Sequence, residues 1–564
     1  MIFRNWVLEN FPFLEDDFDG LTDYELFCKF MGYVKELAKD NEEFKKELDD
    51  LEEKINNLDL QTEVDNKLDE MASDGTLASI INQEIFGELN EAIGQNTSDI
   101  SDINTAISNL PTDESDIAAL KKFNQYTNQP LKYSKLDLST FLPTLDFNVY
   151  RNLDGTIKTD FNLDAYDSSN KVYVNRDSGN DTSGAGTHAS PFKTIKKALD
   201  YIETQAGTNY KVVVETYRFF RSEFYNSDPT NYYTPTKNVV IEPDDLTKQI
   251  ICAPDDETLS WSQDNGNTYK ATRSNVSYVL KEGTGESGYG CLNKITNATS
   301  LTECRNTQDS WFQSGSTVYL HTDGGAPTSA KYMIVLNVPV FCLDLRNNTW
   351  LRIRNCKFYS ASTMKLYNLS SSNFENRLIM ENCDIYYNNN ASAGNGFNCD
   401  NIKFIYLKNC RTAYNMRDGF NYHYTNMPNA TVRLGYVCEE NCQSYENGFE
   451  DTQNAINNAS TIHEQGNILR INGIYQNSKG PLIADIGAPH VAMLHCKVYQ
   501  GANYYPFDFR NDDNTGGVAV LCDIECIGTK NYDIHSTDPL FDVKLKNYKG
   551  IYESPDVTIT LYQE

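Results

Sequence analysis

One short phrase returns at a nearly fixed interval between residues 350 and 530, and it restricts the possible folds more than any other feature. The phrase alternates apolar and polar residues and then reads Asn-Cys. Its clearest copies, 27 residues apart, are Asn355-Cys356, Asn382-Cys383 and Asn409-Cys410, with looser copies around Cys442, Cys496 and Cys526. Repeats of this length are typical of solenoids, and alternation at period two predicts strands. The sequence therefore predicts a parallel β-helix, in which each coil buries its apolar side chains on the next.

The Asn of the phrase suits the sharp bend between two strands of one coil. Asn tolerates the left-handed backbone conformation that such a bend needs. Stacked coils would place these Asn side chains above one another, with their amides bonded along the column. The adjoining cysteines would then point inward as small hydrophobes.

Composition excludes several classes of function. The formal net charge of −30 argues against nucleic acid as a partner. No apolar run approaches the roughly 18 residues of a membrane span, so no membrane insertion is expected. No cleavable signal peptide follows Met1, and at least six of the 14 cysteines lie in strand phrases. We therefore expect reduced, buried thiols in a protein made in a cytoplasm.

The N-terminal part carries two further patterns. Residues 1–30 hold many aromatic side chains in an acidic segment without a core of its own, and we predict that they dock on a partner. Apolar residues then recur at alternating steps of four and three within 31–110, which predicts a helical coiled-coil stalk. Ile at both core positions favours a parallel homotrimer, with Asn96 as a polar layer. An amphipathic helix packed on a globular domain is the alternative.

The rest of the chain divides into a linker, the β-helix and a cap. Residues 111–170 are polar and predict a linker with short strands. The β-helix is expected over 171–545, with an insertion of hairpins at about 255–335, and residues 546–564 would close its end. Near its start, Ser190 would cap a helix that runs to about Tyr201.

Three segments resemble known families. The strand, Gly/Asp loop and helix over 172–201 resemble the opening of pectate-lyase-like β-helices, where the helix plugs the open core. Residues 3–18 (Phe-Arg-Asn-Trp-Val to Asp-Asp-Phe) and 66–77 (Asn-Lys-Leu-Asp-Glu-Met to Asp-Gly-Thr-Leu) resemble virion-attachment segments of tail proteins from phages of low-GC Gram-positive hosts. The β-helix part of the likeness is generic to many carbohydrate-binding and carbohydrate-cleaving proteins.

This resemblance implies a bacteriophage tail spike or receptor-binding fibre. The implied fold is mainly β, a right-handed parallel β-helix preceded by a trimeric coiled coil. The implied homotrimer is made in the host cytoplasm and becomes a tail appendage of the virion. It would attach to tail or portal-proximal proteins through residues 1–30, and its β-helices would meet host surface polysaccharide.

A second repeat predicts a strip of side chains that could bind sugars. It begins with Gly-Phe at residues 396–397, 419–420 and 448–449, and the segments 481–485 and 506–510 continue it. If the Phe side chains point inward, alternation places two columns outward. These columns are Asn398, Asn421, Glu450, Ile483, Asp508 and Asp400, His423, Thr452, Asp485, Arg510, with Tyr504 and Tyr505 at their edge. The alternative for each residue is a solvated face of the β-helix.

Within this strip Glu450 and Asp485 are the predicted catalytic carboxyls. Their diagonal would be on the order of 8 Å, inside the roughly 6.5–9.5 Å range of inverting glycosidases. His423 could orient either carboxyl or act as a base in a lyase. The segment Thr461–Glu464 is predicted to overhang the strip from a loop. Because its His-Glu pair lacks the second His of a zinc helix, no metal ion or other cofactor is expected.

Three functions remain open from the sequence. The first is an adhesin that attaches the virion to host glycan without catalysis. The second is a tail-spike depolymerase, either a glycoside hydrolase or a polysaccharide lyase. The third is a purely structural tail component.

Overall fold

The computed structural model describes residues 134–136, 138, 145–151, 157–225, 232–255, 259–281, 292–329, 331–360, 362, 364–369, 375–389, 394–424, 435–451, 456–464, 466–487, 490–501, 504–510, 517–528, 533–536, 541–550 and 558–561. The predicted attachment segment (1–30) and coiled-coil stalk (31–110) lie outside these ranges. No helix in the described part of the chain is both long and apolar enough to cross a membrane.

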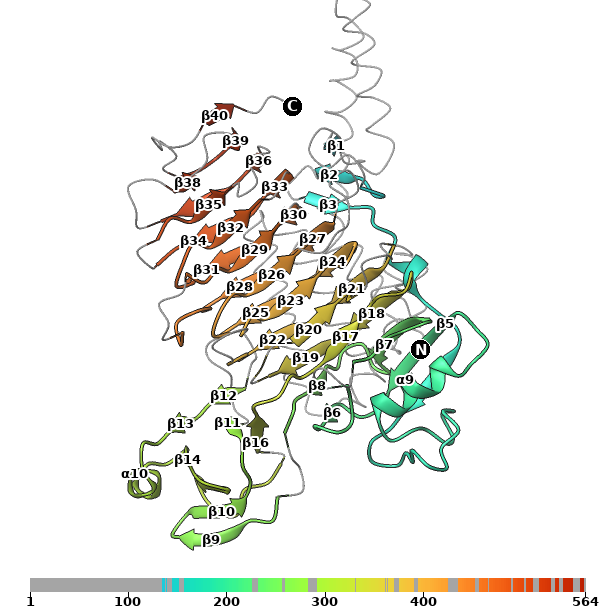
Figure 1. Cartoon of the computed structure of the whole chain (residues 1–564), viewed down its shortest axis with the longest axis vertical. Helices are drawn as coiled ribbons and strands as arrows, with labels where there is room; N and C mark the ends of the chain where they lie inside the picture. Colours follow the sequence, from blue (N-terminus) through green and yellow to red (C-terminus); the bar gives the residue numbers. More distant parts are fainter. Residues whose placement is uncertain are drawn as a thin grey trace, which may run out of the picture. The chain divides into compact units, whose positions relative to one another are not determined.

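Three long sheets, in which each strand is parallel to its neighbours, form the walls of a parallel β-helix (Figure 1). Each coil from β18 to β38 adds one strand to a 12-stranded sheet, then one to a 9-stranded sheet, then one to an 8-stranded sheet. The 12-stranded sheet contains β4 (Lys171–Val174), β5 (Asn209–Val214), β7 (Asn238–Pro243), β18 (Trp350–Arg354), β21 (Arg377–Glu381), β24 (Phe404–Lys408), β27 (Tyr436–Glu440), β30 (Asn467–Ile471), β33 (His490–Leu494), β36 (Gly517–Cys522), β39 (Phe541–Lys546) and β40 (Thr558–Leu561).

The other two walls have shorter strands. The 9-stranded sheet contains β6 (Arg218–Phe219), β8 (Ile250–Cys252), β19 (Cys356–Tyr359), β22 (Asp384–Tyr386), β25 (Arg411–Ala413), β28 (Gln443–Tyr445), β31 (Ile474–Gln476), β34 (Lys497–Tyr499) and β37 (Glu525–Ile527). The 8-stranded sheet contains β17 (Cys342–Asp344), β20 (Met364–Tyr367), β23 (Phe397–Asp400), β26 (Phe420–His423), β29 (Ser460–His463), β32 (Ile483–Ile486), β35 (Phe507–Arg510) and β38 (Ile534–Ser536).

The corner between the 12-stranded and 9-stranded sheets has the predicted left-handed bend. Asn355, Asn382 and Asn409 have φ of 53°, 52° and 53°. The amides of Asn382, Asn409, Asn441 and Asn472 each donate to the Asn of the coil before, at 2.8–3.1 Å. The predicted amide column is therefore confirmed, and it fixes the register of successive coils.

Apolar side chains fill the space inside the coils, and the cysteines of the repeat lie among them. Cys356, Cys383 and Cys410 are at most 1% exposed, which confirms their predicted inward position. All twelve cysteines in the described part of the chain are buried.

Helix α9 (Ile195–Glu203) covers one end of this core. Its buried residues, among them Leu199 and Ile202, join the same apolar cluster as the strands. The predicted cap at Ser190 was wrong, because Thr194 is the N-cap and accepts a hydrogen bond from the Lys197 amide. The Asp181 carboxylate accepts hydrogen bonds from the amides of Lys193 and Thr194, which holds this stretch outside the helix.

A charged network crosses the otherwise apolar core. Arg470 of β30 makes a bidentate ion pair with Asp485 of β32 at 2.8 and 2.9 Å, and both side chains are 0% exposed. Glu439 of β27 accepts hydrogen bonds from Ser460 and from the hydroxyls of Tyr422 and Tyr475. The network thus ties together strands from all three walls.

Two segments cover the outer faces of two walls. Between β8 and β17 the chain forms β9 (Ser262–Asn265), β10 (Thr268–Thr272), β11 (Val276–Lys281), β12 (Asn293–Lys294), β13 (Thr296–Asn297), α10 (Leu301–Asn306), β14 (Ser310–Ser314), β15 (Thr317–His321) and β16 (Tyr332–Leu336), in two separate sheets (Figure 1). This insertion packs on tyrosines of the 9-stranded sheet, among them Tyr359 and Tyr386.

The second covering segment precedes the β-helix. It contains β1 (Ser134–Leu136), β2 (Val149–Arg151), β3 (Ile157–Thr159) and the 3-10 helix η3 (Leu163–Tyr166). Its side chains, among them Phe147 and Phe161, pack on the outer face of the 12-stranded sheet at Phe404 and Tyr406. Apolar protein contacts therefore cover much of two walls, whereas the 8-stranded sheet turns mostly polar side chains outward.

Candidate functional site

Strand register assigns the outward side chains of the 8-stranded sheet. Phe397, Cys399, Phe420 and Tyr422 belong to the apolar core, so the residues between and after them face outward. The first outward column is Lys365, Asn398, Asn421, Thr461, Ala484, Asp508 and His535. The second is Tyr367, Asp400, His423, His463, Ile486 and Arg510. We call these two columns the outward face.

The predicted position of Glu450 was wrong. Gly448 has φ of 87° and Phe449 is 52% exposed, so the third Gly-Phe pair lies in a turn and not in a strand. Glu450 forms an ion pair with Lys294 of the insertion at 2.6 Å. The strand that pairs with β26 in this coil is β29, which begins at Ser460, ten residues after Glu450.

The predicted position of Asp485 was also wrong. Aligning Pro481 with Pro506 pairs Ile483 with Asp508, whereas the structure pairs Ile483 with Phe507. A slip of one residue exchanges the two faces of a strand. Asp485 therefore points inward, where it belongs to the core network with Arg470.

Six of the other predicted site residues do lie on the outward face. The Asn398 side chain accepts hydrogen bonds from Asn395 and Asn421 at 3.0 and 3.2 Å, and it donates to the Tyr367 hydroxyl at 2.7 Å. This chain of amides is buried, with Asn398 7% and Asn421 2% exposed. One side-chain oxygen of Asn421 and one of Asp400 are buried and accept no hydrogen bond from the described residues.

A second polar group lies further along the outward face. Asp508 accepts hydrogen bonds from Arg510 Nε at 2.9 Å and pairs with His535 Nδ1 at 3.0 Å. The Tyr505 ring stacks on the His535 ring, with centroids 4.7 Å apart and planes 3° apart. Tyr504, the remaining predicted residue, is half-buried beside them.

His423, His463 and Glu464 form a cluster at the end of β26 and β29. The two imidazole rings stack with centroids 4.3 Å apart and planes 11° apart. Glu464 has a left-handed backbone (φ 55°), and its carboxylate oxygens lie 3.1 and 3.2 Å from His423 Nδ1. The Tyr424 amide also donates to this carboxylate at 3.1 Å. Each of the three residues offers one metal-ligating atom, and these atoms lie within 4.8 Å of one another.

The pKa values of all three residues of the cluster are shifted. Burial alone would raise the pKa of Glu464, but the hydrogen bond and charge of His423 lower it. Burial opposes the charged form of His423, yet the Glu464 carboxylate raises its pKa. His463 has its pKa lowered to about 4, first by burial and then by the charge of His423.

Two carboxyls near the cluster have raised pKa values, whereas the pKa of Glu464 is lowered. Burial raises the pKa of Asp400 to about 6, although the charge of His423 partly opposes this. Burial also raises the pKa of Asp418 to about 6, against hydrogen bonds from the Asn458 amide and side chain at 2.7 and 3.1 Å. Both groups can therefore hold a proton near neutral pH.

His463 and Glu464 were predicted to lie in an overhanging loop, whereas His463 ends strand β29 and Glu464 follows it. Asp418 was not among the predicted site residues. A usable signal was present. Residues 459–463 (Ala-Ser-Thr-Ile-His) match 419–423 (Gly-Phe-Asn-Tyr-His) with the His in the same place, and the two segments pair as β29 and β26.

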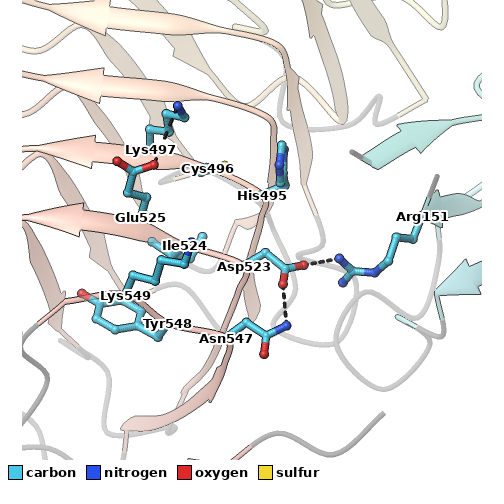
Figure 2. A pocket seen from close by; sticks show the side chains of 10 residues that line it. All are labelled: Arg151, His495, Cys496, Lys497, Asp523, Ile524, Glu525, Asn547, Tyr548 and Lys549. Atoms are coloured by element: carbon cyan, nitrogen blue, oxygen red, sulfur yellow. Dashed lines mark hydrogen bonds and ion pairs between the residues drawn. The ribbon is translucent and has the colours of Figure 1, made fainter. Parts of the chain in front are cut away.

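A separate cavity of about 470 Å³ lies at the corner of the 12-stranded and 9-stranded sheets (Figure 2). It is lined by His495, Asp523 and Asn547, the last members of the corner column, and by Arg151 of β2. Asp523 pairs with Arg151 and accepts a hydrogen bond from Asn547 at 2.8 Å, as the dashed lines in Figure 2 show. None of the predicted site residues lines this cavity.

No protein-family model matches the chain, and no curated protein matches it. Similar solved structures include a complex of XylC with xylose (10% identity, TM-score 0.39, 67% of this chain and 75% of that chain). Others are a glycoside hydrolase (10%, 0.37, 68% and 97%) and the A-module of the Azotobacter vinelandii mannuronan C-5 epimerase AlgE4 (12%, 0.29, 65% and 92%). Likenesses with TM-scores this low do not assign an activity.

Proposed function

We propose that this chain is a β-helical enzyme that cleaves a polysaccharide on the outward face of its 8-stranded sheet. One observation carries the proposal. A carboxyl that can stay protonated, Asp400, is the cross-strand neighbour of His423, and His423 in turn contacts a carboxylate whose pKa is lowered, Glu464. Carboxyls whose environments push their pKa values apart are the usual sign of an acid and a base in one site.

Asp400 is the proposed general acid. Breaking a glycosidic bond requires a proton on the leaving oxygen, and a carboxyl with a pKa of about 6 can supply it near neutral pH. One side-chain oxygen of Asp400 is buried and accepts no hydrogen bond from the described residues, which disfavours the ionised form and is consistent with a raised pKa.

The His423–His463–Glu464 cluster is the proposed source of the base. In a hydrolase this base would activate a water molecule, and in a lyase it would remove a proton from the sugar ring. The structure supports either reaction, and their products differ: both create reducing ends, but only the lyase creates unsaturated sugars.

The shape and chemistry of the face suit a long carbohydrate chain. From β23 to β35 it crosses five strands, on the order of 20 Å at the usual strand spacing. Asn398 and Asn421 form a buried hydrogen-bonded row beneath one end, the half-buried side chains of Asp400 and His423 lie beside them in the second column, and the stacked Tyr505 and His535 rings lie at the other end. An adhesin would need these contacts but not the opposed carboxyls, so the second function from the sequence is favoured over the first.

Turnover with purified full-length protein tests the proposal. The chain would be incubated with a panel of bacterial capsular and cell-wall polysaccharides, followed by measurement of reducing ends and of ultraviolet absorbance from unsaturated products. Asp400→Asn should lower kcat by ~10²-fold or more. The matched control is Asp177→Asn, at an exposed loop carboxylate with only a 3.9 Å ion pair to Arg176. Binding to a glycan without products would instead support an adhesin.

We also propose, on the sequence resemblance alone, that this enzyme is a homotrimeric bacteriophage tail appendage. In this proposal residues 1–30 attach it to the virion and residues 31–110 form the trimeric stalk. Incorporation into virions of a chain lacking residues 1–30 would contradict the attachment site.

A further inference from the structure

The cluster at the end of β26 and β29 has the geometry of a metal site as well as that of a hydrogen-bonded pair. His423 and His463 occupy the last positions of two paired strands, so their rings leave the sheet on the same side. The backbone of Glu464 turns with positive φ and directs its carboxylate back to His423. Three ligating groups thus converge from two adjacent coils.

The distances between these groups are close to those in a bound site. Two ligands of a tetrahedral ion, each ~2.0–2.1 Å from it, lie about 3.3 Å apart. The Glu464 oxygens are already 3.1 and 3.2 Å from His423 Nδ1. The ligating atom of His463 lies within 4.8 Å of both partners, so a small approach of the three side chains would complete the set.

Thr461 determines which nitrogen His463 can offer. The Thr461 hydroxyl donates to the Ala484 carbonyl, so it can only accept from His463 Nε2, which lies 3.1 Å away. This hydrogen bond places the proton of the neutral ring on Nε2 and leaves the lone pair on Nδ1. Metal-ligating histidines typically donate their second N–H in this way, which fixes the tautomer and the ring.

From this arrangement we propose that His423, His463 and Glu464 bind one divalent ion of the zinc type. Two imidazoles and one carboxylate suit Zn²⁺, Co²⁺ or Ni²⁺, whereas Ca²⁺ and Mg²⁺ prefer oxygen ligands only. The three side chains are half-buried, so the site is open to solvent on one side. The inference goes beyond the proposed function, because the ion would bind whether or not the face cleaves a polysaccharide.

Calorimetric titration of the full-length protein with ZnCl₂, after removal of bound metal with EDTA, tests the inference. Native protein should take up one ion per chain at this site, with no corresponding site for CaCl₂. His463→Ala and Glu464→Gln should each weaken the affinity by more than tenfold. Thr461→Val should weaken it by about 10- to 100-fold, as loss of a second contact to a ligating His does.

His188→Ala is the matched control. His188 also pairs with a carboxylate, that of Glu215, but its side chain is 78% exposed. This variant should keep the affinity of the native protein. All variants retain the 14 cysteines, so zinc taken up by thiols appears equally in each. Circular dichroism confirms that each variant is folded.

Two results would overturn the inference. One is no uptake of Zn²⁺, Co²⁺ or Ni²⁺ by the native chain. The other is uptake that is unchanged in folded His463→Ala and Glu464→Gln. Neither result depends on the polysaccharide assay, so failure of the metal site and failure of the proposed function are distinguishable.

Discussion

Replacing Arg470 by Met should destabilise the β-helix about as much as truncating a large apolar core residue to Ala, although Met keeps most of the side-chain volume. Arg470 is 0% exposed and makes two ion-pair contacts with Asp485 and one hydrogen bond to the Ser460 hydroxyl at 3.0 Å. Its removal leaves the Asp485 carboxylate in the core without its cation. Breaking one side of a buried ion pair costs about 3–5 kcal/mol, a large part of the ~5–15 kcal/mol that stabilises a domain.

The double variant Arg470→Met/Asp485→Leu separates the ion pair from simple packing. It removes the charges of Arg470 and Asp485 and fills their space with apolar side chains. We therefore expect it to recover most of the stability that the single variant loses, as replacement of buried ion pairs by apolar residues often does. Glu439 retains its hydrogen bonds from Tyr422, Ser460 and Tyr475 in this variant, but it loses the Arg470 charge that opposes the rise burial causes in its pKa, so it takes up a proton more readily. The coupling energy between the two positions should be at least about 2 kcal/mol.

The loss of stability in the single variant should also depend on pH, because the Arg470 charge opposes the rise that burial causes in the pKa of Glu439, and the variant removes this opposition. A buried acid whose folded pKa lies above its unfolded pKa gives full stability below the unfolded value, and this stability is lost as pH rises through the folded value. The single variant should therefore be closer to native stability at pH 4 than at pH 8. Urea unfolding followed by circular dichroism at both pH values measures this. Two results would show that the buried ion pair does not stabilise the core. One is a decrease in unfolding free energy below about 1 kcal/mol for the single variant at pH 8, and the other is a double variant no more stable than the single one.

The remaining predictions concern the corner column, the Arg151 contact and the assembly. Asn382→Ala should lower stability by ~1–2 kcal/mol because Ala resists the left-handed backbone, and Asn382→Gly should lower it less; equal thermal midpoints for the two would contradict this. Burial would raise the pKa of Asp523, but hydrogen bonds from Asn547 and Arg151 lower it. The stabilisation it gives is therefore present above about pH 4 and lost as pH falls through the folded pKa, and Asp523→Asn should flatten the acid side of the melting-temperature profile. Light scattering of the intact chain should give a trimer, and a chain lacking residues 31–110 should give a smaller species; a stable monomer of the intact chain would exclude the stalk.

The corner of the β-helix could be predicted from the sequence because its signal is local. The left-handed bend needs a residue such as Asn, and it recurs at a constant distance from the next strand, so Asn355, Asn382 and Asn409 mark the register without knowledge of the rest of the coil. The thiols that follow were placed correctly for the same reason. The start of α9 was not, because the carboxylate that holds Lys193 and Thr194 outside the helix comes from Asp181, earlier in the loop.

The site was harder to predict because the connections that lead to it differ in length. Between the 9-stranded and 8-stranded sheets the chain needs residues 387–396 in one coil, 414–419 in the next and 446–459 in the one after. In the third coil the Gly-Phe motif recurs at 448–449, inside the longer connection and before the strand, which is how Glu450 was chosen over β29. The orientation of Asp485 was predicted wrongly because its strand was aligned one residue out of register. Alternation shows which residues share a face of the strand, but it does not show which face is inward.

The most direct measurement of the central claim is a crystal structure of the Asp400→Asn protein soaked with an oligosaccharide from a polysaccharide that the native protein cleaves. We expect sugar rings along the outward face, with hydrogen bonds to half-buried side chains of its second column such as His423 or Arg510, and a glycosidic oxygen beside position 400. An oligosaccharide bound in the corner cavity lined by Arg151 and Asp523, with the outward face bare, would contradict it.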